Sequence, residues 1–182
     1  MARREEETSK PKRLMIRPAV VQDSSEIARI HIDAWRSAYH EFVPRSYLES
    51  LEIEGRTKRW QRILAESQSS TFVLEFAGDI VGWVSYGESR DDDCKGDGEV
   101  WALYVSPRCW RHGYGRVLLD HVEKTAIDSQ VTNLFLWVLE ENKNGRKFYE
   151  RVGYAFDGAR KMVKIGGVQL SELRYKKLVG QE

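Results

Sequence analysis

Two glycines, two arginines and a histidine lie close together between Arg111 and Arg116, in a segment that could hold a phosphate group. Gly113 and Gly115 lack a Cβ atom, so a ligand can approach their backbone N–H groups closely. A helix N-terminus carries unpaired N–H donors and about +0.5 of an elementary charge. With His112 adding to the charge at a helix start near Gly113, the segment predicts a pyrophosphate site. A plain glycine-containing helix start is an equal alternative.

A second polar group follows the apolar run that ends at Leu139. Asn142 stands where a helix is expected to begin, and its side-chain oxygen can cap that helix. Tyr149 is seven residues further on, two helical turns away, so the two side chains share one face. A cap role for Asn142 and core packing of Tyr149 beside Phe148 are the alternatives to a site.

Other kinds of site find little support. The chain has no P-loop pattern and no serine-hydrolase elbow, and Leu118 replaces the third small residue of a dinucleotide fingerprint. The four histidines lack metalloprotease spacing, and Cys94 and Cys109 form no metal or disulfide pattern. We therefore expect no metal. A formal net charge of +1 and the lack of an apolar run near ~18 residues predict neither a nucleic-acid nor a membrane partner.

The 182 residues suit one domain, because a single core usually holds roughly 100–200 residues. Residues 1–12 are charged and have no apolar segment, which predicts a flexible tail rather than a signal peptide. Residues 13–179 are expected to form the single domain. With two cysteines and no targeting segment in view, the expected location is cytoplasmic.

The elements that must position these residues follow from the apolar pattern. Positions i, i+3, i+4 and i+7 from Ile27 to Ala38 predict an amphipathic helix after a start signal at 23–26. Gly78-Asp79 and Gly166-Gly167 predict hairpin turns, and the polar segment 88–98 a loop. The order predicts an α/β fold with a mixed sheet. Further helices are expected from Pro44, around 60–64, and at 113–128 and 143–152; strands are expected at 14–17, 71–77, 80–86, 99–105, 133–139, around 154–156, and at 168–178.

Together the two segments resemble the motifs of the GNAT superfamily of acyl-CoA-dependent N-acetyltransferases. The first family motif is a strand, a V-x-P stop and [QR]-x-x-G-x-[GA]; the second is N-x-x-[AG]-x-x-[FL]-Y-E-[KR]-x-G-[FY]. Here these patterns read as Val105-Ser106-Pro107, then Trp110 through Gly115, then Asn142 through Tyr154. Trp110 departs from the Gln or Arg of the first motif. The resemblance covers most of the chain, from the strand at Leu14 onward.

The resemblance implies a GNAT fold, with splayed central strands flanked by helices, and acetyl-CoA as cosubstrate. The strand before Pro107 would present free backbone groups to the pantetheine arm, as if the arm were another strand. Lys143 and Lys147 could face a further phosphate or form a solvated helix face. The implied cofactor-binding residues are Leu103, Tyr104, Val105, Arg111, His112, Gly113, Tyr114, Gly115, Arg116, Asn142 and Arg146.

The same resemblance implies direct attack of an amine on the thioester. An amine with a pKa of ~10 is mostly protonated near pH 7, so a base must first remove a proton. Glu99 matches the family's base position, acting directly or through water, although a strand-edge charge is the alternative. Tyr149 would donate a proton to the leaving thiolate, and the N–H of Leu103 would polarise the carbonyl.

The acceptor side is expected to be lined by aromatic side chains. With Tyr47 nearby, and with Glu88 and the run 91–93 at the mouth, such a site suits a cationic amine. The region also resembles a branch that contains polyamine acetyltransferases. Core packing is the alternative reading of aromatics at helical spacing. The expected acceptor-side residues are Trp35, Tyr39, Trp83 and Tyr86.

We therefore predict an N-acetyltransferase that transfers an acetyl group to a primary amine of a small molecule or peptide. The acceptor could equally be a protein or peptide N-terminus, a lysine side chain or an amino-sugar drug. Two other classes stay open: a non-catalytic acyl-CoA sensor and an unrelated nucleotide-binding domain. A homodimer through the C-terminal strands is a further expectation.

Overall fold

A computed structural model describes residues 13–66 and 69–180 of the chain. Their strands form one mixed sheet with the order β1-β2-β3-β4-β5-β7-β6, which confirms the predicted α/β fold. Neighbouring strands are antiparallel except β4 and β5, which are parallel and joined through helix α4. The strands are β1 (Leu14–Pro18), β2 (Ser70–Phe76), β3 (Asp79–Glu88), β4 (Gly98–Val105), β5 (Asn133–Leu139), β6 (Ala155–Ile165) and β7 (Val168–Leu178).

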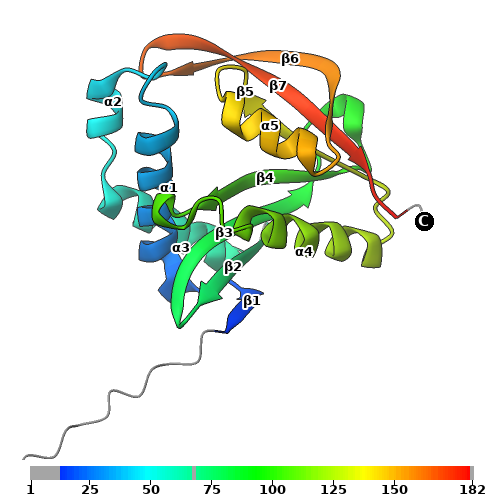
Figure 1. Cartoon of the computed structure of the whole chain (residues 1–182), viewed down its shortest axis with the longest axis horizontal. Helices are drawn as coiled ribbons and strands as arrows, with labels where there is room; N and C mark the ends of the chain where they lie inside the picture. Colours follow the sequence, from blue (N-terminus) through cyan, green and yellow to red (C-terminus); the bar gives the residue numbers. More distant parts are fainter. Residues whose placement is uncertain (1–12, 67–68, 181–182) are drawn as a thin grey trace, which may run out of the picture.

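The helices lie in two groups on either side of the sheet. In Figure 1, α1, α2 and α3 gather at the left, while α4 lies at the lower right and α5 beside β5. The long strands β6 and β7 run from the right edge across to α2. The helices are α1 (Ser24–Ala38), α2 (Arg45–Glu49), α3 (Ile53–Glu66), α4 (Tyr114–Asp128) and α5 (Lys143–Arg151), with short 3-10 helices η1 (Val21–Asp23), η2 (Asp92–Cys94) and η3 (Pro107–Cys109).

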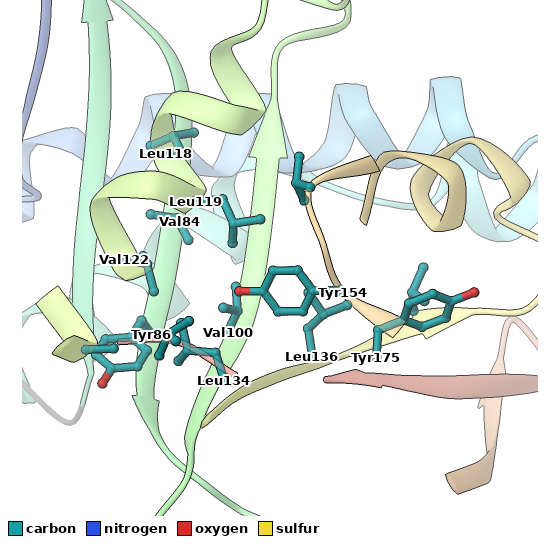
Figure 2. Close-up of a cluster of buried hydrophobic side chains, with 14 of the residues drawn as sticks. Val84, Tyr86, Val100, Leu118, Leu119, Val122, Leu134, Leu136, Tyr154 and Tyr175 are labelled. Carbon is teal, nitrogen blue, oxygen red and sulfur yellow. The ribbon is translucent and has the colours of Figure 1, made fainter. Parts of the chain in front are cut away.

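Helix α4 covers one face of the central strands. Its apolar stripe, which includes Leu118 and Val122, packs on Val84 of β3, Val100 of β4 and Leu136 of β5 (Figure 2). All five side chains are at most 4% exposed. Burying such a side chain contributes roughly 1.5–3 kcal/mol to the free energy of folding. This core therefore holds α4 against β3, β4 and β5.

Helices α1 and α3 cover the opposite face. Ile27 and Ile30 of α1 and Trp60 of α3 pack on Val73 and Trp83 of β2 and β3. The apolar positions of α1 recur every three or four residues, which is the pattern that predicted this helix. The sheet therefore has a helical layer on each face, as the α/β prediction requires.

Strand β6 is the main departure from the predicted elements. The sequence indicated a strand only near 154–156, but β6 extends from Ala155 to Ile165 at the edge of the sheet. Most of its side chains are exposed, so the apolar pattern gave no signal for it. The predicted tail, residues 1–12, lies outside the described residues. No described helix has the length and apolar character needed to cross a membrane.

Strands β4 and β5 pair over only a short stretch. Their ladder joins Gly98–Val100 to Leu134–Leu136 and then stops, whereas β4 stays paired with β3 as far as Val105. In Figure 2 the two ribbons meet near Leu134 and then run in different directions. The edge of β4 that faces β5 is therefore without a strand partner from Trp101 onward.

A bulge at Trp101 changes which side chains of β4 share a face. Val100 pairs with Tyr86 and Ala102 with Ser85, so Trp101 is an extra residue between them. Val100 belongs to the core under α4, whereas Ala102 and Tyr104 pack on the other face. Since side chains alternate along a strand, the extra residue places Glu99, the neighbour of Val100, on the same face as Ala102 and Tyr104.

Candidate active site

The turn between β4 and α4 forms the floor of the place where β4 and β5 part. Arg111 and Gly113 both have left-handed backbone conformations, with φ of 65° and 82°. Gly113 precedes the first turn of α4, which has no side-chain cap, and a Cβ built on Gly113 would meet nothing within 4 Å. Uncapped N–H groups next to open space are the donor set that a phosphate requires.

The side chains around this turn are unevenly engaged. Arg111 and His112 are exposed, and the His112 ring lies 2.9 Å from the Trp110 carbonyl. Arg116 instead binds Asp120 one helical turn along, at 2.6 Å. The residues present fit an oxyanion, and the exposed Arg111 brings positive charge to the turn.

Trp110, the departure from the family motif, has a visible role in the turn. Its indole Nε1 donates a hydrogen bond of 2.8 Å to the carbonyl of Val105, the last residue of β4. The ring therefore ties the turn back to the strand. One lone pair of that carbonyl is therefore already used within the turn.

Gly115, which was predicted for ligand contact, and Gly145 of the second motif are explained in part by packing. A Cβ on Gly115 would lie 3.3 Å from the ring of Phe148 in α5, so this glycine allows α4 and α5 to approach. A Cβ on Gly145 would lie 2.5 Å from the side chain of Asn142. Asn142 Oδ1 accepts a 3.0 Å hydrogen bond from the Gly145 N–H, so the cap role is realised and the side-chain NH₂ is left over.

The residues of α5 differ in their freedom to meet a cofactor. Arg146 donates to the Tyr175 hydroxyl at 3.1 Å and to the Glu140 carbonyl at 3.1 Å, which ties α5 to β7 and to the end of β5. Lys143 and Lys147 are exposed. The phosphate role of Arg146 therefore has no geometric support here, because the structure uses its guanidinium internally.

Tyr149 lies near the parting of β4 and β5, and it keeps its proton. Its ring packs beside Phe148 and Tyr154 at 5.1 Å and 6.2 Å between centroids. Burial raises the pKa of Tyr149 above its ordinary value, and the nearby Tyr104 phenol adds to that shift. The Tyr149 hydroxyl makes no hydrogen bond to the described residues. A protonated phenol without a partner is suited to donate to a developing negative charge.

Glu99 is buried, and both of its carboxylate oxygens face Arg90. The side chain of Glu99 is 2% exposed and accepts bonds from the Arg90 backbone N–H and Nε at 3.0 Å, with Nη2 also in contact. These bonds raise the pKa of the Arg90 guanidinium. Arg90 is itself 57% exposed and lies over the Trp101 ring at 4.8 Å. The expected base is therefore covered by an arginine.

An aromatic cluster forms on the α1 face around Tyr104; we define it as His31, Trp35, Tyr39, Trp83 and Tyr104. The His31 ring stacks on Tyr104 at 4.5 Å, and Trp35 Nε1 donates to the Tyr104 hydroxyl at 2.8 Å. Trp35 also contacts Tyr39 at 5.1 Å. Burial raises the pKa values of Tyr39 and Tyr104, so both phenols are neutral at physiological pH. Three of the four aromatic residues predicted for the acceptor side are thus together.

Tyr86 is a correction to that prediction. It packs in the core under α4, beside Val122 and Leu134 in Figure 2, on the opposite face from Trp83. Residues 83 and 86 are separated by an odd number of positions in one strand, so their side chains point to opposite faces. Tyr86 is therefore a core residue.

Part of the acidic segment 88–98 is bound by an arginine of β7 and is not free at the mouth of the site. Arg174 of β7 binds Asp91, Asp93 and Asp157 at 3.2, 2.8 and 2.7 Å. Trp137 Nε1 also donates to Asp91 at 3.0 Å. Arg174 therefore binds two of the three aspartates that were expected to attract a cationic amine, and it holds the loop against β5 and β7. Asp92 stays exposed beside Lys95.

Sequence reasoning missed three polar residues on this face. Glu172 of β7 is 23% exposed and lies 3.5 Å from Lys161, and its charge reaches Tyr39, Tyr104 and Arg90. The others are Arg174 and Arg56, the latter from the first turn of α3. For the two β7 residues a signal was available. Glu172 and Arg174 alternate along the strand with the buried Leu173 and Tyr175, so they lie on the opposite face of the sheet.

A cavity of about 550 Å³ lies elsewhere, beside η3. Arg29 of α1, Asp79 at the β2–β3 turn and Arg108 of η3 contribute to its wall, and none of the predicted site residues lines it. Among the described residues no group of three or more His, Cys, Asp or Glu side chains is placed to hold a metal ion. The candidate site therefore rests on the strand geometry of β4 and β5.

Comparison with known proteins identifies the family. A model described as "Acetyltransferase (GNAT) family" matches residues 29–154. The N-acetyltransferase YuaI of Bacillus subtilis, described as uncharacterized, is 32% identical over 87% of this chain and 89% of its own. The chain belongs to the GNAT family, and it is an acyltransferase enzyme of the N-acetyltransferase type.

Two further matches describe the fold and a shorter likeness. The crystal structure of the PaiA N-acetyltransferase from Thermoplasma acidophilum, in complex with coenzyme A, superposes with a TM-score of 0.74 at 17% identity, over 91% of this chain and 99% of that one. At this identity the likeness shows the shared fold. The spermine/spermidine N(1)-acetyltransferase of Bacillus subtilis is 29% identical over 47% of this chain and 59% of its own.

Proposed function

We propose that the chain transfers an acetyl group from acetyl-CoA to a primary amine of a small molecule or peptide, at the place where β4 and β5 part. The observation that carries this proposal is the end of the β4–β5 ladder at Val100. It leaves the backbone groups of β4 that point away from β3, from Trp101 onward, free to pair with an extended amide-containing arm. The coenzyme A complex of the Thermoplasma relative supports the choice of donor.

The turn before α4 would hold the pyrophosphate. Its backbone N–H groups, the left-handed residues Arg111 and Gly113 and the exposed His112 provide donors and positive charge in open space. The NH₂ of Asn142 is left over by its cap bond and would meet the amides of the arm. Together these groups would hold the thioester between β4 and α5.

Acetyl-CoA supplies an electrophilic carbonyl carbon and a thiolate leaving group. The free N–H groups of β4 near Leu103 would polarise the carbonyl oxygen. Tyr149 would donate its proton to the sulfur, for which its raised pKa and unoccupied hydroxyl suit it. No residue of the chain needs to form a covalent intermediate.

Two carboxylates on the α1 face could accept the ammonium proton. Glu99 is the expected base, but it is covered by Arg90 and would act only after that guanidinium moves away. Glu172 is a second candidate, because it is partly exposed and its charge reaches the phenols of Tyr39 and Tyr104. Of the two residues, we therefore favour Glu172 as the general base, because its carboxylate is not covered by an arginine.

A two-part experiment tests this function. Coenzyme A should raise the melting temperature more than ATP or NAD does, and acetyl-CoA should release thiol in the presence of a suitable amine. Tyr149→Phe should lower kcat by about 10²-fold while leaving the coenzyme A affinity unchanged. Binding without acetylation of any amine would favour a sensor. Tighter binding of ATP or NAD would instead favour a nucleotide-binding domain.

A further inference from the structure

The side chain of Arg56 extends from α3 toward the aromatic cluster. It is partly buried in the first turn of α3, and its Nη1 is 3.3 Å and 3.4 Å from the two ring nitrogens of His31. The guanidinium also lies over the Trp35 ring at 5.9 Å. His31 in turn stacks on Tyr104 of β4.

Among the described residues, Arg56 differs from Arg90 and Arg174 in having no carboxylate beside it. Arg90 is bound by Glu99, and Arg174 by three aspartates. Within residues 13–66 and 69–180, no Asp or Glu is in ion-pair contact with Arg56. The groups whose charge reaches it are the phenols of Tyr104 and Tyr47 and a second cation, Arg59.

The surroundings make this positive charge costly without an anion. Burial lowers the pKa of Arg56 below its ordinary value, but an arginine stays protonated in proteins. The first turn of a helix is its positive end, so α3 adds to the charge rather than offsetting it. A partly buried charge is stabilised by a partner of opposite sign, and here the chain supplies none from its described residues.

We propose that Arg56 binds an anionic group of the acceptor, so the acceptor is a primary amine that also carries a carboxylate or a similar oxyanion. A guanidinium fork matches a carboxylate with two parallel hydrogen bonds. His31 and Trp35 would hold the fork toward the acceptor, and the amine would then extend past Tyr104. This proposal rests on the proposed function. It opposes a polyamine acceptor, which Arg56 would repel.

Paired acceptors test the proposal directly. An amino acid, its carboxamide and its methyl ester share one amine and one side chain and differ only in the anion. We expect kcat/KM to be about 10- to 100-fold higher for the free acid. The α-amine of an amide or ester loses its proton more readily, so this preference runs against intrinsic reactivity. A phosphonate analogue distinguishes a carboxylate-specific site from a general oxyanion site.

Variants locate the effect at Arg56. Arg56→Gln should raise KM for the free acid about 10- to 100-fold and leave the carboxamide almost unchanged, whereas Arg56→Lys should recover part of the affinity. Arg62→Gln, an exposed arginine on the same helix, is the matched control and should behave as the parent chain. The N-acetyl amino acid product should also bind the parent chain more tightly than Arg56→Gln in calorimetry, a readout that needs no turnover.

The outcomes separate the two proposals. Equal use of acid, amide and ester by the parent chain would overturn the role of Arg56 while leaving N-acetyl transfer intact. An equal loss on all three acceptors in Arg56→Gln, with normal melting, would reduce Arg56 to a structural partner of His31. If no amine is acetylated and the N-acetyl amino acid binds both chains equally, the proposed function and the role of Arg56 both fail.

Discussion

Arg90 and Arg56 bring the same charge to the α1 face of the sheet. Of these two arginines, only Arg90 has a carboxylate from the described residues beside it. Glu99 is correspondingly occupied, while Glu172 is partly exposed with a lysine 3.5 Å away. At the residue scale, the chemistry of this face depends on which polar groups are already bound to one another. The spacing of residue types alone does not determine it.

The two carboxylates can be ranked by substitution. Glu172→Gln should lower kcat by about 10²-fold near neutral pH, because it removes the freer proton acceptor. Glu99→Gln should chiefly lower the free energy of unfolding, since it leaves Arg90 without its buried partner. Steady-state kinetics and urea unfolding on both variants check this ranking. A larger loss of kcat in Glu99→Gln would return the base role to that residue.

His31 makes stability depend on pH. Burial, with Arg56 and Arg59 nearby, lowers the pKa of its imidazole to about 3 from 6.5. The unfolded chain therefore binds a proton that the folded chain does not between pH 6.5 and about 3, and this stability is lost as the pH falls through that window. Between pH 6 and 5, the free energy of unfolding should fall by up to about 1.4 kcal/mol more than in His31→Phe. Identical slopes in urea titrations would contradict a neutral, buried His31.

At the scale of elements, the turn before α4 combines two needs in neighbouring glycines. Gly113 has a positive φ with open space around it, whereas Gly115 makes room for Phe148 of α5. Only the first position is therefore free to meet a ligand. The bulge at Trp101 also serves two needs in β4, because Val100 packs under α4 while Glu99 shares the opposite face with Tyr104.

The Gly113→Ala variant measures the backbone strain at this position without adding a steric clash. The added methyl meets no neighbour, so the cost should be the strain of a left-handed alanine, about 1 kcal/mol. Coenzyme A affinity should fall about tenfold, as for one lost hydrogen bond to phosphate. Gly55→Ala, also in open space but inside α3, should instead stabilise the chain by up to about 1 kcal/mol. Unchanged coenzyme A affinity in Gly113→Ala would argue against a phosphate at this turn.

Arg174 holds the 88–98 segment to the sheet, and its loss should be severe. The side chain is 9% exposed and binds three aspartates, so Arg174→Leu should lower the free energy of unfolding by about 3 kcal/mol. Arg160→Leu, which breaks an exposed pair with Glu140, should change it by less than about 1 kcal/mol. Equal effects in urea unfolding would show that the Arg174 cluster contributes no more than a surface pair.

For the whole molecule, the sequence predicted the parts that depend on local pattern. The two motifs lie on β4–α4 and β5–α5 as expected, and the helix from Ile27 to Ala38 follows its apolar spacing. Strand β6 was missed because an exposed edge strand needs little apolar alternation. Tyr86 was misplaced although residue parity alone would have put it opposite Trp83.

Long-range polar partners could not be predicted in the same way. Arg174 meets residues 83 and 81 positions earlier in the chain, and Arg56 meets a histidine 25 positions away. A carboxylate in a polar loop looks the same whether it faces water or a guanidinium of a distant strand. The fold could therefore be predicted from the apolar pattern and the motifs. Which charged side chains pair with one another could be learned only from the structure.

Three residue pairs are all that connect the two halves of the sheet along its parallel seam. Coenzyme A bound between β4 and β5 would contact both halves of the sheet at once and restrict their movement relative to each other. Amide hydrogens of β5 beyond Leu136 should exchange far more slowly once coenzyme A is bound.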